Sequence, residues 1–197
     1  SGGGSFSLQA PSSSSNNRVF TLPDSADATI LTSTTATGKI LQVVQAVKTS
    51  TAATSTGVYN AITQLQPALT PSSASNKILV TLDLKFGFSN TSADINLKLF
   101  RSVGGSETQI YLGDTSSNRV RVFFGGENSG ILDTESMLPV SSTFLDSPNT
   151  TSEVTYLVKW GIQRGGTYIY INRTGLDTDN ADYPRSASSV TLMEVAA

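Results

Sequence analysis

The stretch Lys77-Ile-Leu-Val-Thr-Leu-Asp-Leu-Lys-Phe-Gly-Phe88 decides the fold class of this 197-residue chain. Every second residue from Ile78 to Phe88 is apolar, and this period of two is typical of a strand with one face in a core. Residues 93–99 repeat the alternation after the turn-like segment 89–92. We therefore expect the two segments to pair as antiparallel neighbours.

The same period marks a third long segment, residues 154–162, in which Thr, Lys and Gln separate large apolar side chains. Gly165-Gly166 predicts a tight turn from this strand into a partner over residues 167–172. Residues 39–48 fit a helical stripe as well as a strand, and their β-branched residues favour the strand. Shorter candidate strands lie at residues 109–112, 119–124, 138–145 and 189–195.

Together these segments give about nine or ten short strands and no long helix, a pattern typical of an antiparallel β-sandwich or barrel. No internal repeat of about 20 to 50 residues is present, which argues against a β-solenoid. The length allows one sizeable core and excludes two large domains. We expect residues 37–197 to form a single all-β sandwich domain.

The composition excludes several classes of function. The chain has no His and no Cys, so triads that run through His, thiolate nucleophiles, disulfides and Cys-type zinc sites are absent. Its net charge is −2 and it has no cluster of Lys and Arg, so we expect no nucleic-acid partner. No apolar run approaches the length of a membrane span. We expect neither membrane insertion nor a cofactor.

Residues 1–36 differ from the rest of the chain. They are rich in Ser, Thr, Gly and Ala and carry only three charged residues. Their apolar residues come in short pieces such as Val19-Phe20-Thr21-Leu22, too few to build a core of their own. We expect an extended arm that is ordered by another chain; the alternative is a disordered tether without a partner.

One dense cluster of carboxylates occurs, at Asp177, Asp179 and Asp182. Calcium takes several oxygen ligands, and alternating Asp residues in a turn can supply them. An EF-hand loop that starts at Asp177 would need Gly and Glu where Asp182 and Ser188 stand. An acidic hairpin turn without metal is therefore the preferred interpretation.

Paired carboxylates are also the machinery of glycoside hydrolysis, which needs an acid and a base or nucleophile across a cleft. The available residues are Asp114, Asp133, Glu135 and Asp146. Each lies in a segment that reads as a turn or a strand end, and spacing alone cannot pair them. Solvated carboxylates in turns are the default, so we expect no catalytic residues.

Tyrosines and arginines provide two further candidates. Tyr168 and Tyr170 share one face of the predicted strand, and with Tyr183 they are candidates for a surface that stacks on sugars. Packing within the sheet or at an interface is the commoner use of such a pair. Arg119 and Arg121 share a face as well, and such arginines more often pair with carboxylates or stay solvated than bind an anion.

Six short segments between Gly38 and Ala197 carry a family resemblance. They are Gly38-Lys-Ile-Leu-Gln-Val-Val-Gln, the run from Leu69 to Val80, Phe144-Leu-Asp-Ser-Pro, Thr155-Tyr-Leu-Val, Tyr170-Ile-Asn-Arg and Ser188-Ser-Val-Thr-Leu-Met-Glu-Val. In this order they resemble a family of structural proteins of aquatic bacteriophages, usually fibres or other components of the virion surface. The resemblance implies a jelly-roll β-sandwich at the end of a longer or trimeric assembly, and it brings no catalytic residues.

The composition fits the same picture, because a His-free, Cys-free and charge-poor domain gains stability from association. We expect a virion surface protein, a homotrimeric fibre or spike subunit that supports attachment to a host glycan or protein and is not an enzyme. The arm would contact other virion proteins. The first alternative is a capsid decoration protein whose arm clamps coat subunits, and a less favoured one is a polysaccharide-degrading enzyme.

Overall fold

A computed structural model describes residues 39–130 and 132–197 of the chain, so the arm predicted over residues 1–36 lies outside the described residues. The described part contains twelve β-strands and no helix, and hence no helix that could cross a membrane. The strands form two sheets, and within each sheet every pair of neighbouring strands is antiparallel.

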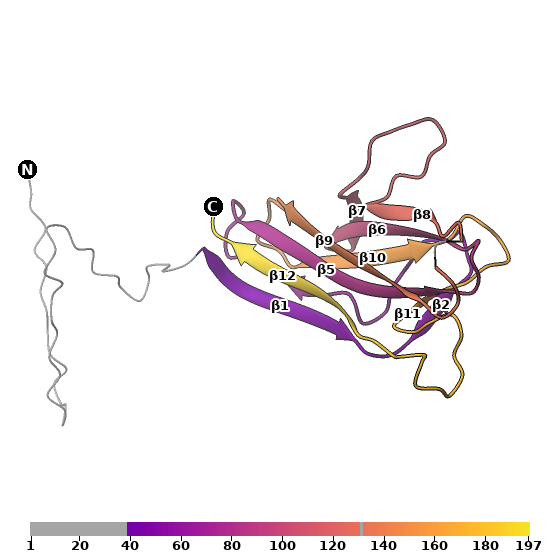
Figure 1. The fold of residues 1–197 in the computed structure, drawn as a ribbon. Coiled ribbons are helices and arrows are strands. Elements are labelled where there is room, and N and C mark those ends of the chain that lie inside the picture. The colour runs from indigo at the N-terminus through magenta and orange to yellow at the C-terminus, as the bar shows by residue number, and fades with distance from the viewer. Residues whose placement is uncertain (1–38, 131) are drawn as a thin grey trace, which may run out of the picture. The chain divides into compact units, whose positions relative to one another are not determined.

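The first sheet, sheet A, is centred on β5 (Figure 1). It consists of β1 (Ile40–Lys48), β2 (Ala52–Thr54), β5 (Lys77–Phe88), β9 (Met137–Asp146), β11 (Ile169–Ile171) and β12 (Ser188–Val195). β9 pairs along one edge of β5, whereas β12 and β11 share the other edge. β1 and β2 then pair with β12 and β11.

The second sheet, sheet B, is centred on β10 and β6, which pair over eight residues. It consists of β3 (Asn60–Ala61), β4 (Ala68–Leu69), β6 (Asp94–Val103), β7 (Ser106–Ile110), β8 (Phe124–Glu127) and β10 (Val154–Gly161). β3 and β4 share the outer edge of β10, and β7 and β8 share that of β6.

The strand order is that of a jelly roll. Sheet A runs β1-β12-β5-β9, and sheet B runs β3/β4-β10-β6-β7/β8. Several connections, such as those from β5 to β6 and from β9 to β10, cross from one sheet to the other, which wraps the chain into a double-layered roll. The predicted all-β sandwich with jelly-roll order is confirmed.

The core lies between the two sheets because each long strand buries alternate residues. In β5 the side chains from Ile78 to Phe88 at even positions are buried, and in β10 those from Val154 to Trp160 are buried. Phe86 of sheet A meets Trp160 of sheet B with ring centroids 6.1 Å apart. The period read from the sequence therefore marks the inner faces.

Two predicted strand pairings are wrong, because their partners lie in different sheets. β5 and β6 do not form a hairpin; the connection between them crosses from sheet A to sheet B. Residues 154–162 and 167–172 likewise give β10 in sheet B and β11 in sheet A. The buried carboxylate of Asp94 holds this second crossing, accepting hydrogen bonds from the backbone N–H groups of Gln163 (2.7 Å) and Arg164 (2.8 Å).

The other predicted strands fare differently. Those at residues 39–48, 138–145 and 189–195 are confirmed as β1, β9 and β12. The candidate at 109–112 is the end of β7, and that at 119–124 is wrong apart from Phe124, where β8 begins. Residues 111–123 form a loop closed by the Arg121 Nε, which donates to the Gly113 carbonyl at 2.8 Å. This arginine therefore does not present its guanidinium on a strand face.

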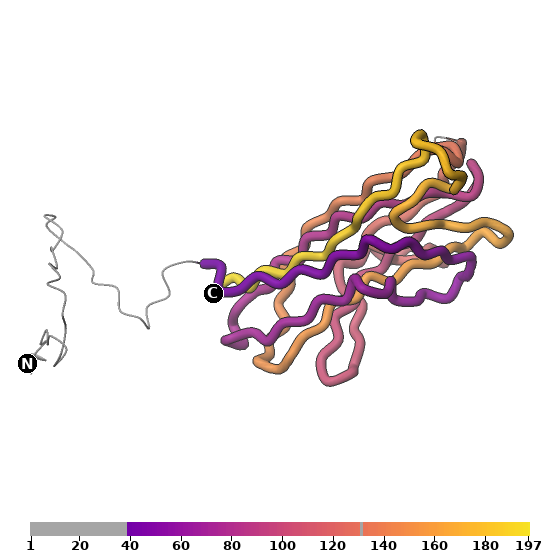
Figure 2. Tube along the Cα trace, turned by 90° about the horizontal axis from the view of Figure 1, so that it is seen from below, coloured from indigo at the N-terminus to yellow at the C-terminus, as the bar shows by residue number. Residues whose placement is uncertain are grey.

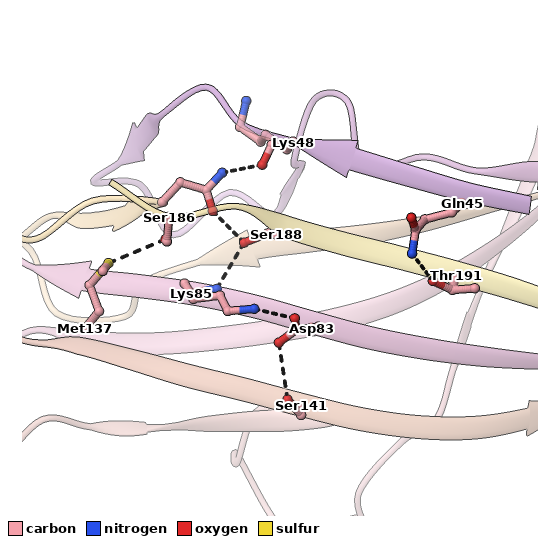
Figure 3. A network of polar contacts seen from close by, with 10 residues as sticks. Gln45, Lys48, Asp83, Lys85, Met137, Ser141, Ser186, Ser188 and Thr191 are labelled. Atoms are coloured by element: carbon pink, nitrogen blue, oxygen red, sulfur yellow. Dashed lines mark hydrogen bonds and ion pairs between the residues drawn. The ribbon is translucent and has the colours of Figure 1, made fainter. Parts of the chain in front are cut away.

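Buried polar residues join the strands of sheet A (Figure 3). The fully buried Asn172 donates from Nδ2 to the carbonyls of Lys48 (2.7 Å) and Ser50 (3.1 Å) and accepts from the Ser188 hydroxyl (2.6 Å). Ser188 in turn accepts from the backbone N–H of Lys85 at 3.0 Å. No buried side-chain nitrogen or oxygen in the described part of the chain lacks a partner, so these groups stabilise the fold.

Candidate binding site

Different segments of the chain meet at the two ends of the sandwich. At one end the Ala196 backbone N–H donates to the Lys39 carbonyl at 2.7 Å, so the end of β12 lies beside the start of β1 (Figure 2). At the opposite end, residues 89–93, 128–130, 132–136 and 162–168 lie together, joined by backbone hydrogen bonds such as Asn128 N–H to Ala93 C=O at 2.9 Å. We call this second end the loop end (Figure 1).

Tyr168 and Tyr170 form a short aromatic ladder near the loop end. Their ring centroids are 6.2 Å apart and the ring planes are within 6° of parallel. The guanidinium carbon of Arg173 lies 3.6 Å from the Tyr170 centroid and covers that ring. Ile169 and Ile171 point into the core, so the predicted division of this strand into two faces is correct.

The ladder is held in place from several sides. The backbone N–H of Tyr168 donates to the Ser89 hydroxyl at 2.8 Å, and the N–H of Ser89 donates to the Tyr168 carbonyl at 3.0 Å. Arg173 Nη1 donates to the carbonyls of Thr174 (3.0 Å) and Gly175 (3.1 Å). Tyr168 remains 46% exposed. The ladder is therefore a pre-organised stack with one accessible ring.

Such a stack suits the apolar face of a sugar ring, because tyrosine offers a flat apolar surface with a polar tip and few torsions to immobilise. The guanidinium over Tyr170 makes a cation–π contact that fixes the inner ring. Tyr183, the third tyrosine of the prediction, does not join the ladder contacts; its hydroxyl donates to Glu135 Oε1 at 3.3 Å. The candidate sugar surface thus reduces to Tyr168 and Tyr170.

An apolar pocket opens near the loop end where β8 and β9, the edge strands of the two sheets, lie beside the core. Its volume is about 240 Å³. It is lined by Phe88, Ile95, Phe124, Gly125, Gly126, Glu127, Asn128, Leu132 and Leu138. The Asn128 side chain fixes one wall by accepting from the Leu132 N–H at 2.8 Å and donating to the Leu132 carbonyl at 2.5 Å. A pocket of this size accommodates a single apolar group.

The acidic turn after β11 is held by arginines. Asp177 contacts Arg185 at 2.6 Å and Arg173 at 3.6 Å between nitrogen and oxygen. A polar hollow of about 280 Å³ lies over residues 177–180, Tyr183 and Arg185. Among the described residues, no three carboxylates are grouped to hold a metal ion. The charge of Asp177 is therefore neutralised by the chain itself.

The carboxylates considered for glycoside hydrolysis have structural contacts. Asp133 accepts from the backbone N–H of Glu135 (3.0 Å) and from the Ser136 hydroxyl (2.8 Å), and these hydrogen bonds lower its pKa. Asp114 accepts from the N–H of Thr115 at 2.7 Å. Each of these two carboxylates orders its own turn.

The interpretation of Asp146 as a solvated strand end is wrong. Its residue is only 5% exposed, its Oδ1 lies 2.9 Å from Arg101 Nη1, and its Oδ2 accepts from the Tyr156 hydroxyl at 2.7 Å. Burial, followed by the charge of Asp146, raises the pKa of Tyr156. Asp146 is in phase with buried Val140 along β9, which is the sequence signal for its burial.

Glu194 is the third buried carboxylate, after Asp94 and Asp146, and one that sequence reasoning missed. It is 1% exposed and accepts hydrogen bonds from Asn76 Nδ2 (2.6 Å), Gln42 Nε2 (2.6 Å) and both the backbone N–H and the hydroxyl of Ser72 (2.7 and 2.8 Å). Burial raises its pKa, but these four donors outweigh burial and lower the pKa to about 2. Glu194 lies on the same face of β12 as the buried residues Val190 and Leu192, and this alternation in the sequence could have predicted its burial.

Comparison with known proteins adds little. No family model and no curated protein matches the chain, so the resemblance to phage structural proteins stays a prediction. Among solved structures, the chain is similar to the VP2 subviral particle of infectious bursal disease virus, with 11% identity, a TM-score of 0.32 and coverage of 79% of this chain. The Gx strain of the same virus gives 8%, 0.33 and 79%.

The chain spans 41% and 36% of the length of those two viral chains. The Eiger TNF protein of S. frugiperda is similar over 71% of this chain and 96% of its own, with 6% identity and a TM-score of 0.29. At these identities and TM-scores the matches carry no argument about function.

Proposed function

We propose that the chain is a virion structural protein, a homotrimeric fibre or spike subunit at the particle surface whose β-sandwich supports host attachment without catalysis. The arm of residues 1–36 contacts other virion proteins in this proposal. The jelly roll is one of the folds that viral capsid and lectin domains use, and because fold alone does not fix function, the argument rests on the site.

The observation that carries the proposal is that the entry and exit of the chain lie at one end of the sandwich and the exposed aromatic surface lies at the other. The residues that lead into β1 and out of β12 meet at one end, through the Lys39–Ala196 hydrogen bond. The loop end, with the exposed ring of Tyr168, is the opposite one. A domain joined at one end and presenting fixed aromatic surface at the other is suited to attachment.

The use of the carboxylates supports a role without catalysis. Asp146 and Glu194 are consumed by buried hydrogen bonds, and Asp177 is paired with arginine. A glycosidase needs one carboxyl free to give a proton and a second free to attack or activate water. Of the carboxylates considered for that chemistry, Asp114, Asp133 and Asp146 accept hydrogen bonds from their own turns or from the core.

The proposal is tested by affinity electrophoresis of the full chain in gels that contain lipopolysaccharide or exopolysaccharide from aquatic bacteria. We expect retardation in at least one polysaccharide, lost on Tyr168→Ala and kept on Tyr183→Ala, because only the first removes a ladder ring. Absence of retardation in all of them, or equal loss in both variants, contradicts glycan attachment.

The same samples test catalysis and assembly. We expect no release of reducing sugar and a sedimenting mass of three chains. Release that disappears on Glu135→Gln or Asp177→Asn would establish an enzyme. Cross-linking of residues 1–36 to coat subunits alone, with no cross-link between copies of the chain, would favour the decoration protein.

A further inference from the structure

The outer face of sheet A carries an apolar row that crosses all four main strands. The register places Val43 of β1 beside Met193 of β12, Met193 beside Leu79 of β5, and Leu79 beside Leu145 of β9. All four side chains point away from the core, because their neighbours along each strand point inward. Val43 and Leu145, at the two ends of the row, are 57% and 52% exposed.

The apolar row continues toward the end of the sandwich where β1 begins. Ile40 and Leu41, just before Val43, are also exposed, and Val195 pairs with Ile40. Scattered single apolar residues are normal on a surface, whereas a contiguous group rimmed by polar residues marks an interaction site. Four of the nine exposed large apolar side chains of the described residues lie on β1, and a fifth, Leu145, lies on β9.

Polar side chains border the row on the side of the loop end. The next row is formed by Gln45, Thr191, Thr81 and Thr143. In Figure 3, Gln45 donates to the Thr191 hydroxyl at 2.8 Å. One row further, Asp83 is paired with Lys85 and accepts from Ser141 at 3.4 Å. An apolar centre with a polar rim is the usual anatomy of a protein interface.

The charges of this face indicate what kind of partner it fits. The Asp83 carboxylate is neutralised by Lys85, and Lys77 Nζ donates to the Ser147 hydroxyl at 2.7 Å. The row itself carries no charge, so it offers nothing specific to phosphates, to lipid headgroups or to a strongly charged protein. A second copy of this chain, which is itself poor in charge, can contact the row without electrostatic repulsion.

The dimensions also fit. Four strands of about eight residues cover a face about 20 Å wide and about 25 Å long. Side-chain relief raises the accessible area of such a face toward the roughly 800 Å² per partner that a stable interface buries. β1 is moreover an edge strand, with β12 as its neighbour within the described residues, and unprotected apolar edges are rare in monomers.

We propose that the apolar row, Val43, Met193, Leu79 and Leu145, is a subunit interface covered by a second copy of this chain. The inference rests on the proposed homo-oligomer and deepens it by naming the face through which the copies meet. It also separates two surfaces: sheet A near the start of β1 serves assembly, and the ladder near the loop end stays free for attachment.

The first experiment measures the mass of the full chain by sedimentation velocity. The variant Val43→Lys/Leu145→Lys places charge at both ends of the row, and the control Ser116→Lys places it at an exposed position of the loop 111–123, between β7 and β8 of sheet B. We expect an oligomer for the parent and the control, and a monomer with an unchanged far-UV spectrum for the double variant, because a lysine ammonium in an apolar interface is strongly disfavoured.

The second experiment uses the absence of cysteine from the sequence. Leu145→Cys and Ser116→Cys each introduce one thiol, whose rate of alkylation by a maleimide reports its accessibility in the folded protein. We expect the thiol at position 145 to react at least about tenfold more slowly than the thiol at position 116 in the oligomer, and the two rates to converge on dilution to monomer.

Three results would overturn the inference. An oligomer that survives Val43→Lys/Leu145→Lys and alkylates equally at both positions uses another face, which leaves the proposed function intact. A parent chain that is monomeric with both thiols accessible removes the proposed homo-oligomer as well. A monomer in which only the thiol at 145 is protected has its row covered from within the same chain.

Discussion

Arg101 on β6 and Asp146 at the end of β9 form an ion pair that ties sheet B to sheet A. Arg101 Nη1 lies 2.9 Å from Oδ1 and 3.0 Å from Oδ2, and donates to the Ser147 carbonyl at 3.2 Å. Tyr156 of β10 supplies a third donor to the same carboxylate. The charge of Asp146 is buried, so its stability depends on these donors.

Arg101→Met keeps most of the side-chain volume and removes the counter-charge. We expect the free energy of unfolding to fall by about 3 kcal/mol, because a buried carboxylate is left unpaired. Urea unfolding followed by Trp160 fluorescence measures the change. Arg164→Met, which breaks the exposed pair with Glu127, is the control and should cost less than about 1 kcal/mol. Equal losses in the two variants would refute the role given to Asp146.

The lowered pKa of Glu194 predicts that the folded state loses stability in acid. Its pKa is lowered from 4.5 to about 2 in the folded chain, so the folded state holds the charged form more tightly than the unfolded state does. This stabilisation is present above pH 4.5 and is lost as pH falls toward about 2, by up to about 3 kcal/mol in total.

Glu194→Gln should flatten the dependence of stability on pH between about 4.5 and 2, because the titrating group is gone. At pH 7 the variant should be less stable than the parent, since Gln replaces an ionised acceptor of four hydrogen bonds. Urea midpoints at several pH values measure both effects. A variant whose acid-induced loss matches that of the parent would show that other carboxylates dominate.

Gly175 packs so closely against the end of β5 that no side chain larger than a hydrogen atom fits on its Cα. A Cβ at Gly175 would overlap the Phe88 carbonyl oxygen, and one at Gly87 would overlap the Arg173 carbonyl oxygen. Gly175→Ala is therefore expected to cost more than about 3 kcal/mol or to prevent soluble expression. Gly126→Ala is the matched control, because a Cβ there meets nothing within 4 Å. Thermal unfolding of the two variants decides the matter.

Asn172 adopts a positive φ of 63° and donates to two carbonyls in the core of sheet A. Asn172→Asp preserves shape and replaces that donor by an acceptor, so we expect a loss of more than about 2 kcal/mol at pH 7. The loss should shrink at pH 5, because burial beside two carbonyl oxygens raises the pKa of the new carboxyl and its protonated form restores a donor. Denaturant titrations at both pH values test this, and a loss that is independent of pH would contradict it.

The sequence predicted the strands better than their partners. The period of two in residues 77–88 depends only on which face is buried, and a single sandwich core makes that face unambiguous. Whether β6 lies beside β5 or across the core from it leaves the same alternation in both strands. The choice is made by contacts such as that of Asp94 with the backbone of residues 163 and 164, which are remote in the sequence.

The candidate site was predicted in part for the same reason. Tyr168 and Tyr170 were correctly placed on one face because strand geometry is local. The covering of Tyr170 by Arg173 depends on a turn at Asn172 with positive φ, which residue type alone does not specify. Asp146 and Glu194 both occupy inward-facing positions in the alternation of their strands, which indicated that they are buried. The sequence analysis did not predict this, because acidic residues are rarely buried.

The hydrogen bond between Ala196 and Lys39 has a mechanical consequence. Tension applied between Lys39 and Ala196 would pull β1 and β12 apart from the same end of the sandwich, breaking their ladder of hydrogen bonds one pair at a time. Tension between Lys39 and the loop end would instead run along the strands and load many rungs together. Because rupture under force follows the unfolding barrier, the second direction should resist far larger forces. If the domain attaches to a host through its loop end, as we propose, this is the direction in which it would be pulled.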